Sequence, residues 1–468
     1  MSQQRSATTR RQFLAGTASG AAAFGFPMLV PATALGRGGL AAPSERIRVG
    51  LIGCGNHGVY WNLPQIFRCP DVQVVAVCDV DRNHLAEGQK AVDAHYGPIV
   101  GKDYPPCATY SDFRKLVLRK DVDVVSNHTP DHWHIIPSIM AAKCGKDVIC
   151  EKPLTLFHAE GVALCKAVAQ QKGVFQTASE NRSIDVYIRL AELVRSGVLG
   201  KLQRIEVGLP TGNNDLRLGP QSKATFNLTS PQQPPPELDY DTWLGQAPGL
   251  PYIPARIHGS FRWNLAFSGG VLTDWGAHMI DLAQWGHDTE HTGPISVVGK
   301  GDFPPGEAVF NTAPTFELEY EYADGVTMSV KSDGPYIRFR GSNGWLFSPG
   351  WRGALEASDP AILETRVDPD QVRVYRPSEI VSAAEGNKGG EHRNFYDCVK
   401  TRKPTYAPAE VGHRTITIAH IGNIAMMLGR KLRWNPDAED FVGDSEAGAM
   451  LTRSQRFPWT IENIDQWI

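Results

Sequence analysis

Apolar and polar positions alternate in blocks through the part of the chain that follows residue 46. Runs rich in Val and Ile stand at 47–52, 72–78, 122–126 and 147–150. Segments with the period of a helix separate them, at about 59–67, 82–95, 111–119 and 134–143. Strands that are apolar throughout are covered on both faces, so this alternation predicts an α/β domain with a doubly wound parallel sheet.

The pattern changes beyond residue 154. A stretch rich in Pro and Gly, 209–260, has few periodic segments. The elements expected around it are a helix at 159–172, strands at 173–178, 316–322 and 327–331, and a long helix near 414–429. Turn sequences such as Ala323-Asp324-Gly325 join the later strands. This half of the chain therefore predicts an α+β domain with a mostly antiparallel sheet.

Composition excludes several classes of function. The 468 residues, of which 42% are hydrophobic and 21% charged, are typical of a globular protein with two or three domains. A net charge of -3 gives no electrostatic reason to expect nucleic acid as a partner. The 8 cysteines form no CxxC pair, so neither a zinc knuckle nor a thioredoxin-like site is indicated.

The first 36 residues have a composition of their own. Arg10 and Arg11 precede a stretch rich in small and apolar residues, and Ala32-Thr33-Ala34 offers a cleavage site. This sequence resembles a twin-arginine export signal, which predicts a partner in the twin-arginine machinery and a periplasmic or otherwise exported protein. The alternative is a disordered N-terminus that contains two arginines by chance. No other stretch is long and apolar enough to span a bilayer, so we expect no permanent membrane anchor.

Three glycines stand between the first expected strand and the first helix. Gly53, Gly55 and Gly58 form the pattern GxGxxG at this strand–turn–helix junction. The first permits a tight turn, the second lets a pyrophosphate approach the backbone, and the third allows close helix–strand packing. The helix N-terminus adds N–H groups and a positive dipole end. We therefore predict a dinucleotide site, in which Asn56 and His57 also contact the cofactor.

An acidic residue ends the second expected strand. Asp79 lies about twenty residues beyond the last glycine, where a carboxylate accepts hydrogen bonds from the adenosine ribose hydroxyls. Its charge would repel a 2′-phosphate, which favours NAD. Arg82 could pair with that phosphate, so NADP stays an alternative.

A histidine-rich motif follows the third expected strand, at the edge where parallel sheets bind ligands. It reads Asn127-His128-Thr129-Pro130-Asp131-His132-Trp133-His134. Pro130 sets a turn, and we expect Thr129, Pro130 and His134 at the cofactor, with Trp133 or His134 beside the nicotinamide. The histidines lack the spacing that places two imidazoles on one helical face, so no metal is predicted.

A second motif, Glu151-Lys152-Pro153, ends the fourth expected strand. The proline restricts Lys152 to an extended conformation, which holds its side chain at the sheet edge near the cofactor. We also expect Glu151 to contact the cofactor there. An ammonium there can hydrogen-bond a substrate hydroxyl and stabilise alkoxide-like charge.

The second half of the chain holds further candidates. Asp274, His278 and Asp281 would share one face of a helix that begins near Asp274. A histidine flanked by carboxylates makes a good general base, and a helix cap with a structural histidine is the alternative. We expect Asp281 and Arg182 to bind the substrate. The polar segment 390–395, together with Arg182, could reach the pocket, and a surface or interdomain role is equally compatible with the sequence.

Together these motifs are similar to those of the glucose-fructose oxidoreductase, inositol dehydrogenase and rhizopine catabolism protein (Gfo/Idh/MocA) family. The resemblance covers nearly the whole mature chain and rests on the glycine motif, Thr129-Pro130 with His134, Glu151-Lys152-Pro153, and Asp274-Gly276-His278. It implies a catalytic set in which His278 accepts the proton, Asp274 orients His278 and binds the substrate, and Lys152 contacts the reacting oxygen. It also implies a large open sheet in the C-terminal domain and a homodimer or homotetramer.

The expected organisation is a signal peptide at 1–34, a linker at 35–45, an NAD(P)-binding Rossmann domain at 46–153 and a substrate-binding and oligomerisation domain at 154–468. Free NAD(H) is not recycled outside the cytosol, so we expect a tightly bound cofactor that is oxidised and reduced within each cycle. The predicted activity is oxidoreduction of a hydroxyl of a sugar, glycoside or polyol.

Three alternatives stay open at this point. An NAD-dependent glycosidase or lyase would work through a transient keto-sugar. A dehydrogenase with exchangeable NAD(P) would require the export signal to be spurious. A non-catalytic sugar-binding or sensory protein could have kept the fold.

Overall fold

The computed structural model describes residues 40–212, 220–305, 308–383 and 390–468. The expected signal peptide at 1–34, and the linker as far as residue 39, lie outside these ranges. Within them, no helix combines the length and the apolar composition that crossing a membrane requires.

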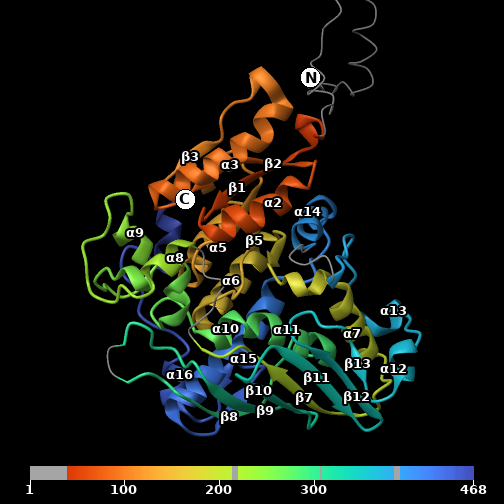
Figure 1. Ribbon diagram of the computed structural model, residues 1–468. Helices are drawn as coiled ribbons and strands as arrows, with labels where there is room; N and C mark the ends of the chain where they lie inside the picture. Colours follow the sequence, from red (N-terminus) through yellow and green to blue (C-terminus); the bar gives the residue numbers. More distant parts are fainter. Residues whose placement is uncertain (1–39, 213–219, 306–307, 384–389) are drawn as a thin grey trace, which may run out of the picture.

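The N-terminal domain is the expected doubly wound parallel sheet (Figure 1). Its strand order, β3-β2-β1-β4-β5-β6, is that of a dinucleotide-binding Rossmann fold. The strands are β1 (Ile47–Ile52), β2 (Val72–Cys78), β3 (Ala108–Tyr110), β4 (Val124–Asn127), β5 (Asp147–Cys150) and β6 (Phe175–Thr177). Helices α2 (Leu63–Phe67) and α3 (Arg82–Val100) cover one face, and α4 (Phe113–Val117), α5 (Ile135–Lys143) and α6 (His158–Gln171) cover the other.

The parallel sheet extends past residue 153, where the sequence led us to end the domain. β6 pairs in parallel with β5, with Val148 opposite Phe175, so the sheet continues to Thr177. A later segment also returns to this domain: α14 (Glu391–Thr401) places Phe395 and Tyr396 in the apolar core beneath β1 and β2. The C-terminal domain thus begins later than expected and contributes one helix to its neighbour.

The C-terminal domain is built on a nine-stranded sheet in the order β13-β12-β11-β7-β10-β9-β8-β14-β15. All neighbouring pairs are antiparallel except β7 and β10. The strands are β7 (Leu202–Gly208), β8 (Ser296–Gly301), β9 (Phe316–Glu321), β10 (Thr327–Lys331), β11 (Tyr336–Gly341), β12 (Gly344–Pro349), β13 (Glu356–Ala357), β14 (Leu432–Asn435) and β15 (Asp440–Phe441). The expected fold class, α/β with a mostly antiparallel second sheet, is confirmed.

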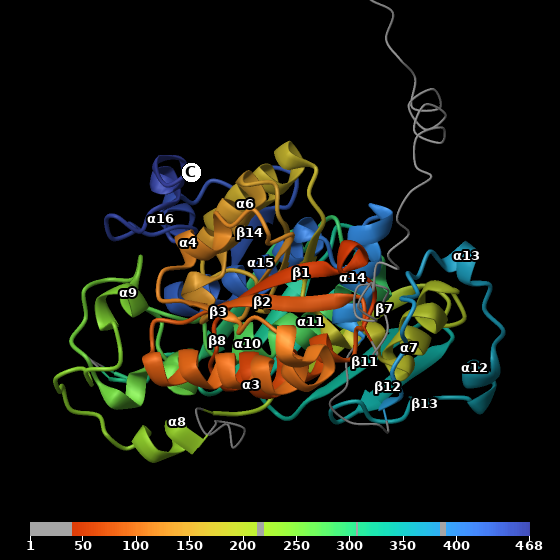
Figure 2. The same ribbon diagram turned by 90° about the horizontal axis from the view of Figure 1, so that it is seen from above.

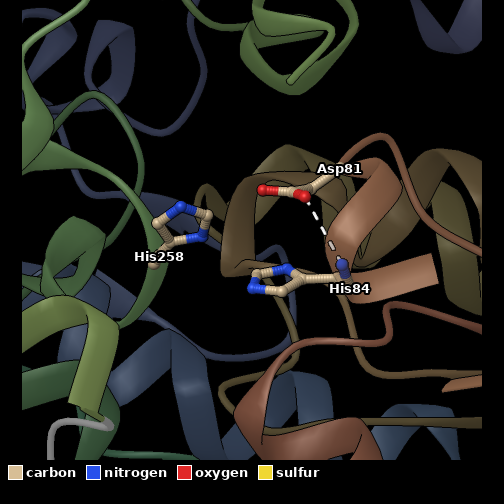
Figure 3. A group of neighbouring side chains, drawn as sticks. All are labelled: Asp81, His84 and His258. Carbon is tan, nitrogen blue, oxygen red and sulfur yellow. Dashed lines mark hydrogen bonds between the residues drawn. The ribbon is translucent and has the colours of Figure 1, made fainter. Parts of the chain in front are cut away.

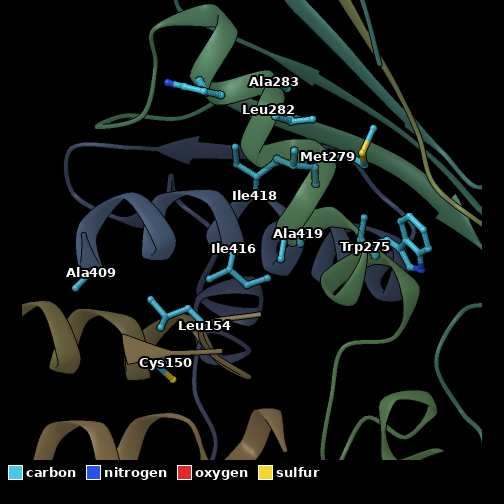
Figure 4. Close-up of a cluster of buried hydrophobic side chains, with 14 of the residues drawn as sticks. Cys150, Leu154, Trp275, Met279, Leu282, Ala283, Ala409, Ile416, Ile418 and Ala419 are labelled. Atoms are coloured by element: carbon cyan, nitrogen blue, oxygen red, sulfur yellow. The ribbon is translucent and has the colours of Figure 1, made fainter. Parts of the chain in front are cut away.

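Helices fill the space between the two sheets (Figures 1 and 2). They are α7 (Asp185–Arg195), α10 (Val271–Asp274), α11 (Gly276–His287) and α15 (Ala409–Leu428). Ile418 and Ala419 of α15 pack with Met279 of α11, and Ile416 lies next to Leu154 (Figure 4). Polar contacts add to this packing, because Tyr320 of β9 donates to the Ile418 carbonyl at 3.0 Å.

A segment of the C-terminal half crosses to the N-terminal domain. This capping segment, residues 228–267, has its own apolar core, formed by Leu238, Trp243, Leu244, Ala247, Tyr252, Ile257, Phe261 and Phe267. It attaches beside β2, where Arg82 N donates to the Glu237 carbonyl and Asp239 N donates to the Val80 carbonyl, each at 3.0 Å. From residue 228 on, the Pro- and Gly-rich stretch therefore bridges the two domains.

The remaining helices are short and peripheral. They are α8 (Pro220–Thr225), α9 (Tyr240–Leu244), α12 (Pro360–Glu364), α13 (Pro369–Val372) and α16 (Ser445–Ala449). Of these, α9 belongs to the capping segment, and its Trp243 and Leu244 are buried in that segment's core.

Candidate active site

A cavity of about 950 Å³ lies at the carboxyl ends of the parallel strands. This volume is within the range of pockets that hold cofactors and small ligands. The N-terminal domain contributes the glycine turn, the histidine-rich motif and the Glu151-Lys152 turn, and the second half of the chain contributes the facing wall. That wall includes Leu238, Thr242, Trp243, His258, Gly259, Phe261, Arg262, Asp274, Trp275, His278, Trp351 and Glu391.

The glycine turn leaves one face of its backbone open. Gly53 has φ +95°, and a Cβ there would lie 2.5 Å from the His128 carbonyl oxygen. A Cβ on Gly58 would lie 2.1 Å from the Gly53 oxygen. At Gly55, by contrast, the nearest atom to a Cβ would be His84 Nδ1, at 4.0 Å. Gly53 and Gly58 are thus required by the backbone, whereas Gly55 opens a surface that a pyrophosphate can approach.

Asp79 stands at the floor of this turn. Its carboxylate accepts hydrogen bonds from Cys54 N at 2.7 Å and from Asp81 N at 2.9 Å. Burial raises the pKa of this carboxyl. Asp79 therefore fixes the glycine turn and lines the cavity at the place predicted for the ribose.

Arg82 was predicted to contact the cofactor, but it does not line the cavity. Its guanidinium donates to the Pro236 carbonyl, because the first turn of α3 lies against the capping segment. The side chains that do line this end of the cavity are Asp81, His84 and His258 (Figure 3). Burial lowers the pKa of His258 to about 4, so its imidazole is neutral at pH 7.

Two groups of described residues have the spacing of metal ligands. One is Asp81, His84 and His258, whose ligand atoms lie within 4.8 Å of one another, and the other is His158, His413 and Glu439. In the second group Arg414 also contacts Glu439, at 3.2 Å, so this carboxylate already has a cationic partner. In the first, the Asp81 carboxylate caps α3 by accepting from Asn83 N at 2.8 Å. Neither group includes a histidine of the 127–134 motif.

The histidine-rich motif is held by bonds within the fold. His134 lies between two carbonyls, with Nδ1 at 2.7 Å from Pro153 O and Nε2 at 2.9 Å from Thr129 O. Burial lowers the pKa of His134 to about 4. His134 thus positions the two turns that carry Thr129 and Lys152, and Thr129, Pro130, Trp133 and His134 all line the cavity.

Glu151 lies among histidines below the glycine turn. His57 Nε2 is 3.0 Å and His128 Nδ1 is 3.5 Å from its carboxylate, and Asn62 Nδ2 donates to it at 2.9 Å. Burial opposes ionisation, but these imidazoles hold the pKa of Glu151 well below its usual range. The carboxylate therefore places negative charge beside the lysine that follows it.

Lys152 meets Asp274 across the cavity. Its Nζ donates to Asp274 Oδ1 at 2.8 Å and to the Asp274 carbonyl at 3.2 Å. Arg262 of the capping segment reaches the same carboxylate, with Nε at 3.3 Å. The predicted catalytic lysine and aspartate are thus brought together from different domains.

His278 lies on the same wall of the cavity. It follows Asp274 by four residues, across the junction of α10 and α11, and its ring lies 5.0 Å from that of Trp351. The orienting role of Asp274 towards His278 stays a prediction. The cavity surface combines this imidazole with the ammonium of Lys152, which is the pairing that the sequence predicted.

Arg182 and Asp281 lie away from the cavity, which corrects their expected contact with substrate. Both are 1% exposed, and the guanidinium donates to the carboxylate through Nε and Nη2, each at 2.8 Å. Arg182 also contacts Glu290 and the Tyr406 carbonyl. Asp281 lies almost one turn of α11 beyond His278, and at that depth its carboxylate meets the buried Arg182 guanidinium instead of the cavity.

Sequence reasoning assigned no role to several acidic side chains of the cavity, among them Asp131, Glu180 and Glu391. Burial raises the pKa of Asp131 to about 7, and Ser268 donates to its carboxylate at 2.5 Å. Two of them lie in segments that the sequence had singled out, Asp131 in the histidine-rich motif and Glu391 in the polar segment 390–395. These residues come from turns and helix ends, where no periodic signal marks a side chain as facing a ligand.

Comparisons with known proteins cover both domains. A family model described as "Oxidoreductase family, NAD-binding Rossmann fold" matches residues 47–179. A second, "Oxidoreductase family, C-terminal alpha/beta domain", matches residues 185–364 and 379–461. The first ends close to β6, in agreement with the domain boundary in the structure.

Among curated proteins, "Glycosyl hydrolase family 109 protein 1" of Shewanella sp. (strain MR-4) is 32% identical over 170 residues. The match spans 35% of this chain and 35% of that protein, so the chain spans about a third of its length. A Comamonas testosteroni protein named "1-carboxy-3-chloro-3,4-dihydroxycyclo hexa-1,5-diene dehydrogenase" is 29% identical over 346 residues, 74% of this chain and 68% of that protein.

The solved structures share the fold. The WlbA dehydrogenase from Bordetella pertussis, in complex with NADH and UDP-GlcNAcA, has a TM-score of 0.60 at 15% identity. The alignment covers 84% of this chain and 98% of that one.

A bulky residue at Gly55 should block the cofactor without unfolding the protein. We expect Gly55→Val to weaken NADH binding at least about tenfold, equivalent to roughly 1.4 kcal/mol, with an unchanged melting temperature. Gly53→Val should lower the melting temperature, because its φ and the His128 carbonyl exclude a side chain. Fluorescence titration and thermal unfolding measure the two effects. Equal loss of stability in both variants would contradict this assignment.

Arg182→Met should act on stability, because it leaves the Asp281 carboxylate buried without its partner. Breaking such a pair costs about 3–5 kcal/mol of unfolding free energy. Adding Asp281→Asn should recover part of the loss, since no lone charge remains. Chemical denaturation of the single and double variants measures this coupling. Normal stability of Arg182→Met together with weakened substrate binding would restore the original interpretation.

Proposed function

Because this chain belongs to the Gfo/Idh/MocA oxidoreductase family and its Rossmann domain binds NAD, we propose that it acts on a hydroxyl of a sugar, glycoside or polyol by hydride transfer. The observation that carries this proposal is the meeting of Lys152 and Asp274 beside His278 on the wall of the NAD-binding cavity. An enzyme of this family is not the non-catalytic protein that the sequence left open.

The catalytic roles follow from the charges of these side chains. Lys152 donates a hydrogen bond to the reacting oxygen and stabilises its developing negative charge. Asp274 holds the ammonium in place, and His278 accepts the hydroxyl proton. Bound NAD supplies the acceptor of the hydride. The substrate carbon lies between these side chains and the glycine-turn side of the cavity.

A carbohydrate suits the surface of this cavity. Its wall alternates aromatic rings, among them Trp61, Trp275 and Trp351, with carboxylates and imidazoles. Aromatic faces pack against the apolar faces of sugar rings, and the polar groups pair with hydroxyls. The glycosyl hydrolase name of the Shewanella relative supports the same substrate class.

The part of the cavity where the adenosine of the cofactor is expected favours NAD over NADP. A 2′-phosphate would meet the carboxylates of Asp79 and Asp81 beside the neutral imidazole of His258. The guanidinium of Arg82, which the sequence offered as a partner for this phosphate, is bound to the Pro236 carbonyl.

We further propose that the cofactor stays bound through the catalytic cycle. The capping segment lines the cavity with Leu238, Trp243 and Phe261 while it is attached beside β2. In this proposal the segment covers one side of the cavity and slows the release of NAD. Retention would suit export through the twin-arginine route, because outside the cytosol a bound cofactor must be reoxidised by a second substrate or within one reaction.

A second candidate function is a glycosidase or lyase that works through a transient keto-sugar. Oxidation of a hydroxyl makes the neighbouring C–H acidic, which permits elimination of a substituent, and returning the hydride restores the cofactor. The names of the family 109 relatives favour it, over the third of the chain that they match.

Lys152→Met and His278→Asn should stop turnover while the cofactor still binds. We expect the rate of NAD reduction by an active carbohydrate to fall about 10²–10⁴-fold, because each variant removes a group that acts on the reacting hydroxyl. Single-turnover absorbance of reduced nicotinamide measures this rate. Lys90→Met, on the exposed side of α3, is the matched control. Wild-type rates in both cavity variants would refute the catalytic assignment.

The exported protein should be purified with NAD bound. We expect near-stoichiometric nicotinamide nucleotide after gel filtration of the periplasmic protein, and an Arg10→Lys, Arg11→Lys variant should stay in the cytoplasm. Nucleotide content is measured after denaturation of each fraction.

Leu238→Asp tests the role of the capping segment in this retention. Its charge would disrupt the segment's core beside the cavity, so most of the NAD should be lost on gel filtration. Leu228→Asp, at an exposed position of the same segment, should keep it. A wild-type protein that emerges free of nucleotide and binds added NAD reversibly would favour the exchangeable-cofactor alternative.

A further inference from the structure

Glu391 brings a buried carboxyl to the cavity from a helix that the catalytic assignment does not use. It is the first residue of α14, is 2% exposed and lines the cavity. Its carbonyl accepts from Gln176 Nε2 at 2.7 Å, and Gly390 N donates to Ser183 Oγ at 2.8 Å. These bonds to β6 and to the turn that follows it fix the backbone from which the Glu391 side chain extends.

One oxygen of the Glu391 carboxyl is free to form a hydrogen bond with a ligand. Among the described residues, its buried Oε2 has no hydrogen-bond partner. A buried polar atom without a partner is costly, and in a ligand cavity the missing partner is supplied by the ligand or by water. Glu391 therefore combines burial, a position at the cavity and an unmet hydrogen bond.

The charges around Glu391 favour its neutral form. Burial raises the pKa of this carboxyl, and the negative charges of Glu180 and Glu151 raise it further. Arg352 opposes them, but its guanidinium is paired with Glu180 at 3.0 Å. His392, the next residue of α14, is held neutral, since burial lowers its pKa to about 3. Tyr406, from the turn before α15, is also uncharged because burial raises its pKa well above the usual value.

We propose that Glu391 is a further catalytic residue of this cavity, which acts in its protonated form by donating a hydrogen bond to an oxygen of the carbohydrate substrate. This inference rests on the proposed function, because it needs a substrate in the same cavity. Lys152 and His278 contact the reacting hydroxyl, whereas Glu391 contacts a second oxygen of the ligand. Because only the neutral carboxyl donates, substrate binding weakens as the pH rises through the titration of Glu391.

The test compares Glu391→Gln and Glu391→Ala in the NAD-loaded protein. Calorimetry with a panel of methyl hexosides and myo-inositol, from pH 5 to pH 9, gives affinity, and nicotinamide absorbance gives kcat and KM. Glu391→Ala should weaken binding roughly tenfold or more at pH 6, since it removes the donor. Glu391→Gln keeps an uncharged donor, so it should retain most of the affinity at pH 6 and lose the decline at alkaline pH. Glu356→Gln, at an exposed position, should match the wild type throughout.

The outcomes separate this inference from the proposed function. Turnover with an unchanged affinity and pH profile in both Glu391 variants would overturn the role of Glu391 alone. Binding that shows the expected pH dependence, without reduction of NAD, would support Glu391 and overturn hydride transfer. No binding of any panel member would overturn both. If Glu391→Ala fails to fold, the pH profile of Glu391→Gln decides, because a structural role would not abolish the alkaline decline.

Discussion

Lys152 and Asp274 bring opposite charges from two domains to within 2.8 Å, in surroundings where neither charge could be buried alone. The Lys152 side chain is 12% exposed and that of Asp274 3%, so separating the domains at this point would leave the Lys152 ammonium without the Asp274 carboxylate. Apolar packing adjoins this pair, where α15 contacts α6 and β6 of the first domain. The ion pair therefore joins the two domains at the position where the proposed substrate would react.

The cavity around this pair is lined by more acidic side chains than cationic ones. Asp131, Glu151, Glu180 and Glu391 all line it. Histidines and arginines compensate some of them, which keeps Glu151 charged, whereas Asp131 and Glu391 have raised pKa values because burial dominates. A single pocket thus presents carboxylates and neutral carboxyls together, a distribution that suits recognition of hydroxyl groups as both donors and acceptors.

The sequence predicted the N-terminal domain in detail because its signals are local. Apolar runs marked β1, β2 and β5, and the glycine spacing marked the turn, since backbone sterics at Gly53 and Gly58 admit no side chain. Lys152, Asp274 and His278 were predicted from motifs that resemble those of a family, and all three line the cavity. The errors concern residues whose partners are remote in sequence: Arg182 pairs with Asp281 in the interior, and Arg82 binds Pro236.

What the sequence by itself determined is therefore the order of elements, the dinucleotide turn and the identity of the chemical groups, because steric and periodic constraints act over a few neighbouring residues. Tertiary structure alone decided which polar groups face the cavity and in what protonation state. Glu391 lies 240 positions beyond Glu151, yet the charge of one alters the pKa of the other. Desolvation and charge interactions depend on distance in space, and the folding of α14 and the capping segment back onto the first domain sets that distance.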